Sequence, residues 1–367
     1  MVQFLLSQLE NTLDVRGARA AVLTLSILVP LTCLAATKEK PAEVSVPAIE
    51  IEGGRRLTFE RMFTTDRDVL GKKGFWTKVV DFVAGEPDEH FLVRPYSIAV
   101  DSRGRAIVTD PGANGVHIFD LAQHKYKFVE RNEKGKESML QPQCVAVDAH
   151  DNFYVTDSET GKVFVFNADG KYQRSIGALK GGEGFFKRPT GIAIDSAAQR
   201  VYITDTLRDK IYVTDMQGQV LATIGKPGSE PGELHYPTEL RIVGDELVVV
   251  DAMNFRIQIF GKDGSYRGSI GEIGDTPGAM FRPKGVSVDS ENHIYVVEGA
   301  SARVQIYDRE GHWLYWFGGK GTGPEEFQLP SGIFIDHEDR IFVVDSFNRR
   351  IQVLHYYGVG KRAGGQP

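Results

Sequence analysis

The fold is decided by a stretch of the chain that reads RPTGIAIDSAAQRVYITD, residues 188–205. It contains a proline, a short aliphatic run ending in aspartate, a polar turn, and a second run rich in β-branched and aromatic residues. Both runs are too short for typical helices and have the composition of β-strands, and the residues between them are typical of a turn. The stretch therefore predicts a pair of antiparallel strands.

The same pattern occurs six times along the chain. The prolines that open the copies are spaced at intervals of 47, 47, 48, 46 and 47 residues, at Pro95, Pro142, Pro189, Pro237, Pro283 and Pro330. A complete copy holds two further strand-like runs, such as residues 210–214 and 219–225. Four strands in a unit of this length are typical of a propeller blade. The sequence thus predicts an all-β fold, a six-bladed β-propeller of four-stranded antiparallel blades over residues 55–358.

Closure of the ring depends on the two ends of the repeat region. The sixth unit lacks a fourth strand, because a glycine-rich and polar segment follows its third run at 350–356. Residues 56–63 alternate apolar and polar side chains and can supply the missing strand, which would remove an unpaired sheet edge. Residues 75–83 carry apolar side chains at helical spacing and predict a short helix, with a closing strand as the alternative.

The N-terminal segment has the composition of an export signal. Arg16 and Arg19 precede an uncharged apolar run over residues 20–36, which predicts a signal peptide or a membrane or lipid anchor at 1–36. Cleavage near Ala36, lipid attachment at Cys33 and an uncleaved anchor remain open alternatives. We expect residues 37–54 to form a flexible linker and residues 359–367 a disordered tail. The expected location is periplasmic or extracellular, with an N-terminus that allows association with a membrane.

Charge and cysteine content narrow the classes of partner. The net charge of −6 and the pI near 5.9 argue against nucleic acid, whose phosphates attract clustered cations. The chain has two cysteines, Cys33 and Cys144, so no disulfide framework is indicated. We expect Cys144 to be a small buried hydrophobic residue. The expected molecule is a monomeric propeller that binds an unidentified protein or small molecule, and no cofactor is predicted.

An acidic residue ends the second strand of every unit, and in five units a basic residue follows five positions later. Because positions related by the propeller axis lie too far apart to share one ion, we interpret these acids as structural turn elements and predict no metal site. The first unit departs from the pattern, since no basic residue follows Asp110 at that spacing. The expected ion pairs are Asp157 with Lys162, Asp205 with Lys210, Asp251 with Arg256, Glu298 with Arg303, and Asp345 with Arg350.

Ligands are expected on the face where the first strand of each unit begins and the second ends. The long glycine-rich connections emerge there, and varied loops on a rigid scaffold commonly carry binding sites. The residues after the repeat prolines should line the mouth of the central channel, with loop residues beside them. The candidates are Tyr96, Gln143, Thr190, Thr238, Glu239, Lys284, Ser331, Arg208, Phe255, Phe347 and Arg349.

The repeat resembles the NHL repeat family of six-bladed propellers. The resemblance rests on a glycine-rich connection with a phenylalanine before the proline, as in 318–327, followed by the two aliphatic runs. Residues 225–251 and 271–298 carry the pattern well. The resemblance implies the fold and a binding surface, whereas members of the family perform unrelated functions. We therefore interpret the chain as a non-catalytic binding or scaffold propeller of the cell envelope, engaging its ligand at the channel mouth.

Two other classes of function remain open. Some relatives are metal-dependent lyases, and other six-bladed propellers are lactonases or hydrolases, but the lyase resemblance requires histidines at the channel. Only His90 and His235 lie in connections on the expected ligand face, so we predict no catalytic residues. The second alternative is an RNA-binding NHL domain. It rests on the basic residues Arg208, Arg256, Arg303, Arg349 and Arg350.

Overall fold

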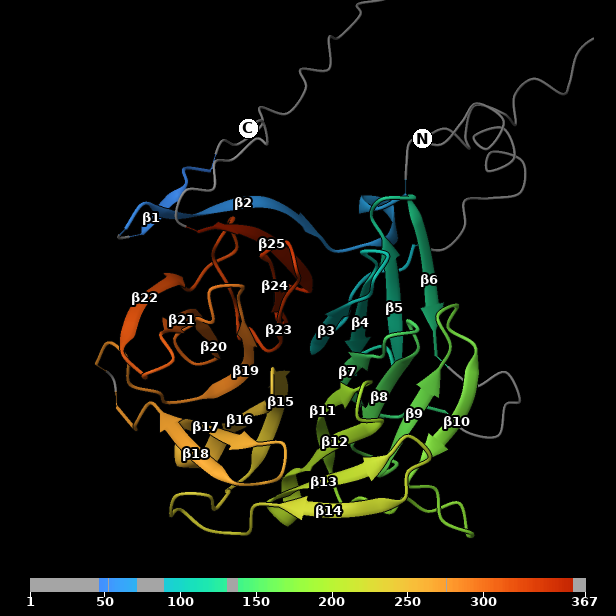
Figure 1. Ribbon diagram of the computed structural model, residues 1–367. Helices are drawn as coiled ribbons and strands as arrows, with labels where there is room; N and C mark the ends of the chain where they lie inside the picture. The colour runs from blue at the N-terminus through green and yellow to red at the C-terminus, as the bar shows by residue number, and fades with distance from the viewer. Residues whose placement is uncertain (1–45, 52, 71–88, 131–137, 275, 359–367) are drawn as a thin grey trace, which may run out of the picture. The chain divides into compact units, whose positions relative to one another are not determined.

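The computed structural model describes residues 46–51, 53–70, 89–130, 138–274 and 276–358. Six antiparallel sheets surround a central axis as the blades of a propeller (Figure 1). This confirms the predicted all-β six-bladed fold. The helix predicted at 75–83, the N-terminal segment with Cys33, and the tail from residue 359 lie outside the described residues.

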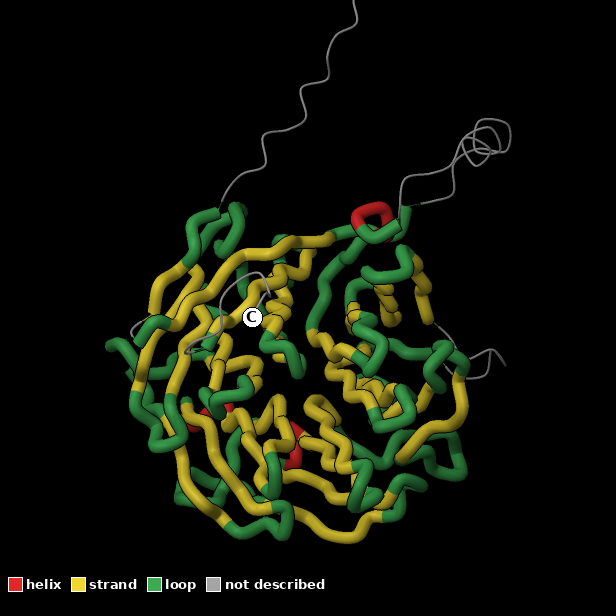
Figure 2. The backbone as a smooth tube through the Cα atoms, turned by 45° about the horizontal axis from the view of Figure 1, so that its top comes forward, coloured by secondary structure: helices red, strands yellow, loops and turns green. Residues whose placement is uncertain are grey.

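Helical structure in the described part of the chain is limited to short 3-10 turns (Figure 2). These are η1 (Asp66–Asp68), η2 (Thr206–Arg208) and η3 (Ala252–Asn254). Of the helices in the described ranges, none has the length and apolar character needed to span a membrane.

Blades 1 to 5 each consist of four consecutive strands, the first nearest the axis and the fourth at the rim. Blade 1 consists of β3 (Ser97–Val100), β4 (Ala106–Asp110), β5 (Gly115–Asp120) and β6 (Lys125–Val129). Blade 2 consists of β7 (Pro142–Val147), β8 (Phe153–Asp157), β9 (Lys162–Phe166) and β10 (Tyr172–Ile176). Blade 3 consists of β11 (Pro189–Asp195), β12 (Arg200–Asp205), β13 (Lys210–Asp215) and β14 (Val220–Ile224). Blade 4 consists of β15 (Pro237–Val243), β16 (Glu246–Asp251), β17 (Arg256–Gly261) and β18 (Tyr266–Ile270). Blade 5 consists of β19 (Pro283–Val288), β20 (Ile294–Glu298), β21 (Arg303–Tyr307) and β22 (Trp313–Gly318).

Blade 6 joins the two ends of the repeat region. It consists of β23 (Ile333–Ile335), β24 (Arg340–Asp345), β25 (Arg350–Tyr357), β2 (Arg55–Phe63) and β1 (Ile49–Ile51). Strand β2 pairs antiparallel with β25, from Arg56 opposite Tyr357 to Phe63 opposite Ile351. The predicted closure by an N-terminal strand is therefore confirmed.

Strand β1 corrects the prediction of a flexible linker over 37–54 at residues 49–51. Residues 49–51 pair with β2 and give blade 6 a fifth strand. The physical reason is burial of apolar surface, because Ile49 and Ile51 pack against a hydrophobic cluster that includes Leu57 and Tyr356. The alternation of isoleucines at 49 and 51 is the signal for this strand in an otherwise polar segment.

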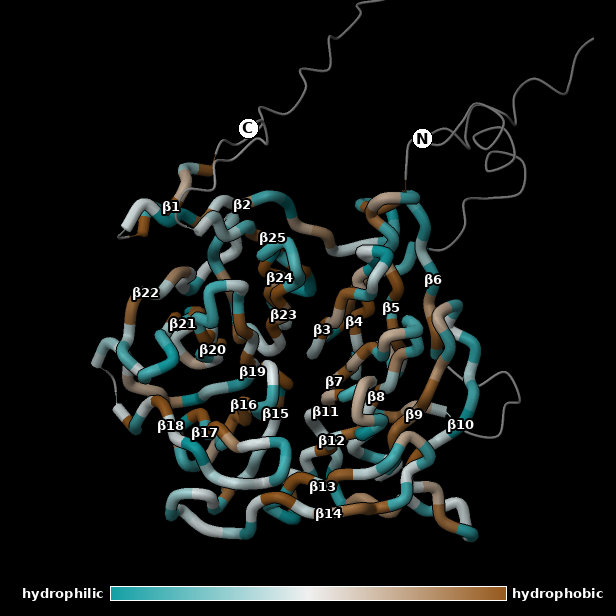
Figure 3. Tube along the Cα trace, in the orientation of Figure 1, coloured by the Kyte–Doolittle hydropathy of each residue, from teal (hydrophilic) through white to brown (hydrophobic). Residues whose placement is uncertain are grey.

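The core lies between neighbouring blades. All residues of β8 are buried, whereas four of the five residues of the rim strand β14 are exposed. Figure 3 shows hydrophobic residues along inner strands such as β4, β5 and β24. One apolar cluster joins Tyr202 and Ile211 of blade 3 to Leu247 and Phe260 of blade 4. Since burying such a side chain contributes about 1.5–3 kcal/mol, contacts between blades are a main source of stability.

Threonine side chains also tie blades together near the axis. The hydroxyl groups of Thr109 and Thr156 donate to the carbonyl oxygens of Gln143 and Thr190 in the next blade. The hydroxyl of Thr204 donates to the carbonyl of Thr238 at 2.7 Å. Each acceptor is the residue that follows a repeat proline, so these bonds fix the main chain at the channel mouth.

Candidate functional site at the channel mouth

The acids that end the second strands organise the loops on the candidate ligand face. Asp110 accepts hydrogen bonds from the main-chain N–H groups of Val93 and Arg94, at 2.6 and 2.9 Å. Asp205 does the same for Lys187 and Arg188, both at 2.9 Å. A carboxylate with several N–H donors needs no metal ion to satisfy it. In blades 1, 2, 3 and 5 the acid therefore holds the residue before the repeat proline in place, which fits a structural role.

The predicted ion pairs form in two blades. The Arg256 Nε lies 2.9 Å from an Asp251 oxygen, and the Arg350 Nε lies 2.7 Å from an Asp345 oxygen. In blade 2 the strand register places Lys162 directly opposite Asp157.

In two further predicted pairs the residues lie opposite one another in neighbouring strands, but the acid and the base form no ion pair among the described residues. The carboxylate of Asp205 pairs with Arg208 at 3.2 Å rather than with Lys210, because the turn η2 brings the Arg208 guanidinium back over it. No ion pair joins Glu298 and Arg303, both of which are described residues, since the Arg303 guanidinium lies 3.9 Å above the Trp316 ring. Arg303 is exposed on β21, so it gains a cation–π contact without leaving water.

A pocket of about 260 Å³ occupies the channel mouth. The residues that flank the repeat prolines line it, together with a few loop residues. Of the predicted candidates, the structure brings five to this pocket: Tyr96, Gln143, Lys284, Ser331 and Phe347.

Three arginines that the sequence reasoning missed also line this pocket. Arg94, Arg188 and Arg282 each precede a repeat proline. The signal was present in the sequence as an Arg-Pro pair in three of the six repeats. Only the residues after the prolines, with loop residues beside them, were expected at the channel mouth. Each arginine before a proline is positioned by a hydrogen bond to the acid that ends the second strand of its blade, a contact that the local sequence does not show.

The channel-mouth pocket is strongly basic. Arg94, Arg188, Arg282 and Lys284 line it, and none of the four has an ion-pair partner among the described residues. Burial and the nearby charges of Arg282 and Arg188 lower the pKa of Lys284. Lys284 is thus close enough to Arg282 and Arg188 to be repelled by them, and an anion placed between these cations would relieve that repulsion.

A buried ion pair lies among the innermost strands. Glu239 is only 3% exposed, and its carboxylate lies 2.5 Å from the Arg241 guanidinium. Arg241 also donates to the carbonyl of Ile333 at 3.0 Å. Burial raises the pKa of Glu239 to about 7, against the opposing effect of Arg241. Glu239 is therefore part of the interior of the ring and does not line the channel-mouth pocket.

The remaining candidates also lie outside the pocket. The Thr190 hydroxyl donates to the carbonyl of Thr238 at 2.9 Å, and the Thr238 hydroxyl donates to that of Lys284 at 3.5 Å, so both connect innermost strands. Arg208 is engaged with Asp205, and its guanidinium lies over the Phe185 ring. Phe255 and Arg349 occupy left-handed positions in loops, with φ of 55° and 56°.

Comparison with known proteins agrees with this architecture. A family model described as "6-bladed beta-propeller" matches residues 135–224, 233–308 and 290–359, more than half of the chain. The chain belongs to this propeller family. Among curated proteins, Protein brain tumor of Drosophila melanogaster is 29% identical over 117 residues, which are 31% of this propeller chain and 11% of that protein. The chain thus spans about a tenth of the length of this relative.

Solved structures share the fold at low sequence identity. Virginiamycin B lyase from Staphylococcus aureus, solved with quinupristin, has a TM-score of 0.52 and 16% identity, over 73% of this chain and 85% of that one. An auxiliary nutrient binding protein from Bacteroides thetaiotaomicron has a TM-score of 0.55 and 13% identity, over 72% of this chain and 69% of that one. A protein of unknown function from the same organism has a TM-score of 0.59 and 16% identity, over 83% of this chain and 76% of that one. Likeness at this identity shows the fold alone.

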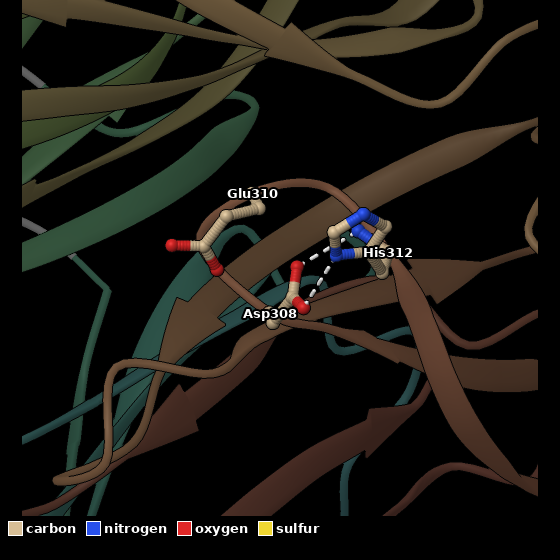
Figure 4. Close-up of side chains that lie close together, drawn as sticks. All are labelled: Asp308, Glu310 and His312. Carbon is tan, nitrogen blue, oxygen red and sulfur yellow. Dashed lines mark hydrogen bonds and ion pairs between the residues drawn. The ribbon is translucent and has the colours of Figure 1, made fainter.

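A cluster of metal-type side chains lies away from the channel mouth. Asp308, Glu310 and His312 gather in the turn between β21 and β22 of the propeller (Figure 4). The Nδ1 atom of His312 lies 2.8 Å from an Asp308 oxygen, and the other Asp308 oxygen accepts from the main-chain N–H of His312. These bonds explain the cluster as an exposed polar turn. The histidines expected on the ligand face are dispersed, with His90 near Asp66 and His235 near Asp209.

Proposed function

We propose that this protein is a non-catalytic binding propeller that holds an anionic group of a small ligand or partner protein at the channel mouth. The observation that carries the proposal is the convergence of Arg94, Arg188, Arg282 and Lys284 on one pocket. Guanidinium and ammonium groups bind carboxylates and phosphates through charge-assisted hydrogen bonds, which are stronger than neutral ones. Tyr96 and Gln143 add neutral polar groups to the same lining.

The main chain of the three arginines is held in place before any ligand binds. The N–H groups of Arg94 and Arg188 donate to the acids of their blades at 2.9 Å, and that of Arg282 donates to Glu298 at 3.0 Å. Each arginine is also followed by a buried proline, which restricts its backbone. A pre-organised site loses less conformational entropy on binding. This supports a binding role for the loops rather than a passive solvated surface.

The chemistry of the pocket favours binding over turnover. Its described lining contains neither histidine nor carboxylate, the usual groups for proton transfer. The nearby thiol of Cys144 is buried, and burial raises its pKa, which disfavours the reactive thiolate. The structural neighbours include both a lyase and a nutrient-binding protein, so the fold does not decide between the two roles. The match to Protein brain tumor and the repeat pattern support the finer assignment to NHL-type propellers.

The proposal can be tested with a panel of anions of known chemistry. We expect citrate or pyrophosphate to raise the melting temperature of the full chain at low ionic strength, and the double variant Arg188→Gln/Lys284→Gln to abolish the rise. Arg349→Gln is the matched control, because Arg349 is an exposed arginine outside the pocket. An equal rise of the melting temperature in the natural protein, the double variant and Arg349→Gln would contradict the proposal. A short single-stranded RNA that binds with a steep salt dependence, when citrate and pyrophosphate do not, would favour the RNA-binding alternative.

We also propose that the propeller functions outside the cytoplasm. Support comes from the uncharged apolar run at residues 20–36, preceded by arginines. Mass spectrometry of the mature N-terminus, after cell fractionation, distinguishes the three processing routes. Lipid attached at Cys33, cleavage near Ala36 or an intact segment in the membrane fraction would each agree with export. An intact segment in the cytosolic fraction would contradict it.

A further inference from the structure

A second pocket, of about 590 Å³, lies on blade 5. The equivalent positions in blades 4 and 6 hold an arginine side chain, and comparison with them explains why blade 5 has a pocket. In blade 4 the guanidinium of Arg256 fills this position, with Nε bonded to Asp251 at 2.9 Å. Its terminal nitrogen donates to the carbonyl oxygens of Glu230 and Glu233, both at 3.0 Å. The side chain of Gln258 bonds Asp251 and the Glu233 carbonyl beside it.

Blade 6 repeats this arrangement. The Arg350 Nε donates to Asp345 at 2.7 Å. Its terminal nitrogens donate to the carbonyl oxygens of Thr322, Gly323 and Glu326, at 2.6, 2.8 and 2.8 Å. A carboxylate and several carbonyl oxygens of the glycine-rich connection thus form a receptor for one guanidinium group, and the chain's own arginine occupies it.

In blade 5 the receptor is present but no guanidinium enters it. Glu298 replaces the aspartate and is 2% exposed, and its Oε1 atom has no hydrogen-bond partner. Its Oε2 accepts from the main-chain N–H groups of Phe281 and Arg282, at 3.4 and 3.0 Å. The side chain of Gln305 donates to the carbonyl of Ala279 at 2.8 Å, as Gln258 does to Glu233. A buried carboxylate oxygen without a partner is costly, so this site favours an incoming cation.

The residue that would fill the receptor points elsewhere. Arg303 corresponds to Arg256 and Arg350, but its guanidinium stacks on Trp316 at 3.9 Å. Both Arg303 and Trp316 line the pocket together with Glu298. The aromatic ring therefore keeps the chain's own arginine at the wall of the pocket.

The rim of the blade 5 pocket is apolar. Ile273 and Phe281 are each 62% exposed and line it, and the Phe281 ring stacks on Phe255 at 6.3 Å. Exposed apolar side chains around a buried polar group are characteristic of protein-binding surfaces. The occupant that matches both features carries one cation flanked by apolar groups.

We propose that the blade 5 pocket binds an arginine side chain of a partner protein. The guanidinium enters the receptor formed by Glu298 and the carbonyl oxygen of Ala279, as Arg256 does with Asp251 and the Glu233 carbonyl in blade 4. Apolar residues next to that arginine contact Ile273 and Phe281. The ligand proposed here is a cation, whereas the ligand proposed for the channel mouth is an anion. The two proposals are therefore tested independently.

The probe is the tripeptide acetyl-leucyl-arginyl-leucine amide, titrated into the full chain while intrinsic tryptophan fluorescence and calorimetric heat are recorded. Its control is the same peptide with citrulline, which has nearly the same shape but no charge. We expect the arginine peptide to bind about tenfold more tightly or better, because the guanidinium forms a charge-assisted hydrogen bond with the Glu298 carboxylate and the uncharged citrulline side chain does not. Equal binding of the two peptides, or absence of saturable binding, would overturn the proposal.

Variants of the protein test whether the arginine peptide binds at the blade 5 pocket. Glu298→Gln should weaken binding of the arginine peptide by about tenfold, whereas Glu310→Gln should not, because Glu310 is an exposed acid in a turn of the same blade. Ile273→Lys, at an exposed rim position, should weaken binding through like-charge repulsion without affecting folding. Binding that survives both Glu298→Gln and Ile273→Lys would refute the assignment.

Discussion

At the scale of single residues, the interior of the ring accommodates one acid where neighbouring strands carry glycine. The positions equivalent to Glu239 in β11 and β19 are Gly191 and Gly285. A Cβ atom at Gly285 would lie 3.0 Å from a Glu239 oxygen, so the glycine provides space for the carboxylate. Arg241 compensates the charge at 2.5 Å. The ion pair and the small residues around it thus form one packing unit.

Glu239 should make stability depend on pH. Its folded-state pKa of about 7 lies above the ordinary 4.5, so the folded protein binds the proton more tightly and stability falls as pH rises from 4.5 through 7. Relative to Glu239→Gln, the natural protein should lose up to about 3 kcal/mol of unfolding free energy between about pH 5 and pH 8. Urea denaturation at both pH values measures the difference. Parallel pH profiles for the two proteins would show that Glu239 does not titrate in this range.

Gly285→Ala should destabilise the ring. The added Cβ would lie 2.6 Å from the Ser331 carbonyl oxygen and 3.1 Å from the Ile333 nitrogen, both main-chain atoms of blade 6. Because main chain cannot rotate away, we expect a loss of about 1–3 kcal/mol in denaturant-induced unfolding. Gly268→Ala in β18 is the control, since its Cβ would meet no atom within 4 Å. Similar effects of the two substitutions would argue against close packing of innermost strands.

At the scale of elements, β2 holds the ring closed. Leu57 of β2 is fully buried in the cluster of blades 5 and 6, opposite Tyr356 of β25. Leu57→Ala should therefore lower the unfolding free energy by about 2–5 kcal/mol. Thr58→Ala, at a partly exposed position of the same strand, should have a much smaller effect. A small effect of Leu57→Ala in equilibrium denaturation would mean that blade 6 is stable without β2.

Strands were predictable from the sequence where the repeat determines them. The spacing of the prolines predicted the blades, and the alternation at 56–63 predicted β2. Strand β1 was missed because three residues in a polar segment give too short a pattern, and only packing against blade 6 stabilises them. Elements that depend on local composition were thus predicted better than those that depend on tertiary contacts.

The candidate site was predictable only in part, for a related reason. Tyr96, Gln143 and Lys284 were expected at the channel mouth because the repeat places them there. Arg94 and its counterparts were missed because an acid on another strand positions them. The exchange of Asp for Glu298 was visible in the sequence, but the stacking of Arg303 on Trp316 required the structure.

At the scale of the whole propeller, the described residues line two pockets of different chemistry. The channel mouth presents Arg94, Arg188, Arg282 and Lys284, whereas the blade 5 pocket presents the carboxylate of Glu298. The net charge of the chain is −6, so the basic mouth is a local feature on an acidic protein. If the mouth binds an anion as proposed, such a distribution would steer that anion toward the mouth and away from the remaining surface.

The central claim, that the channel mouth binds an anion, is tested most directly by calorimetric titration of the full chain with citrate at several salt concentrations. We predict one saturable site whose affinity falls as salt rises, and whose salt dependence is weaker in Lys284→Gln, because one cationic contact is lost. Loss of saturable binding in Arg188→Gln/Lys284→Gln, with Arg349→Gln unchanged, would place the site at the mouth. Binding with the same affinity in the double variant, or no saturable binding to the natural protein, would contradict the account.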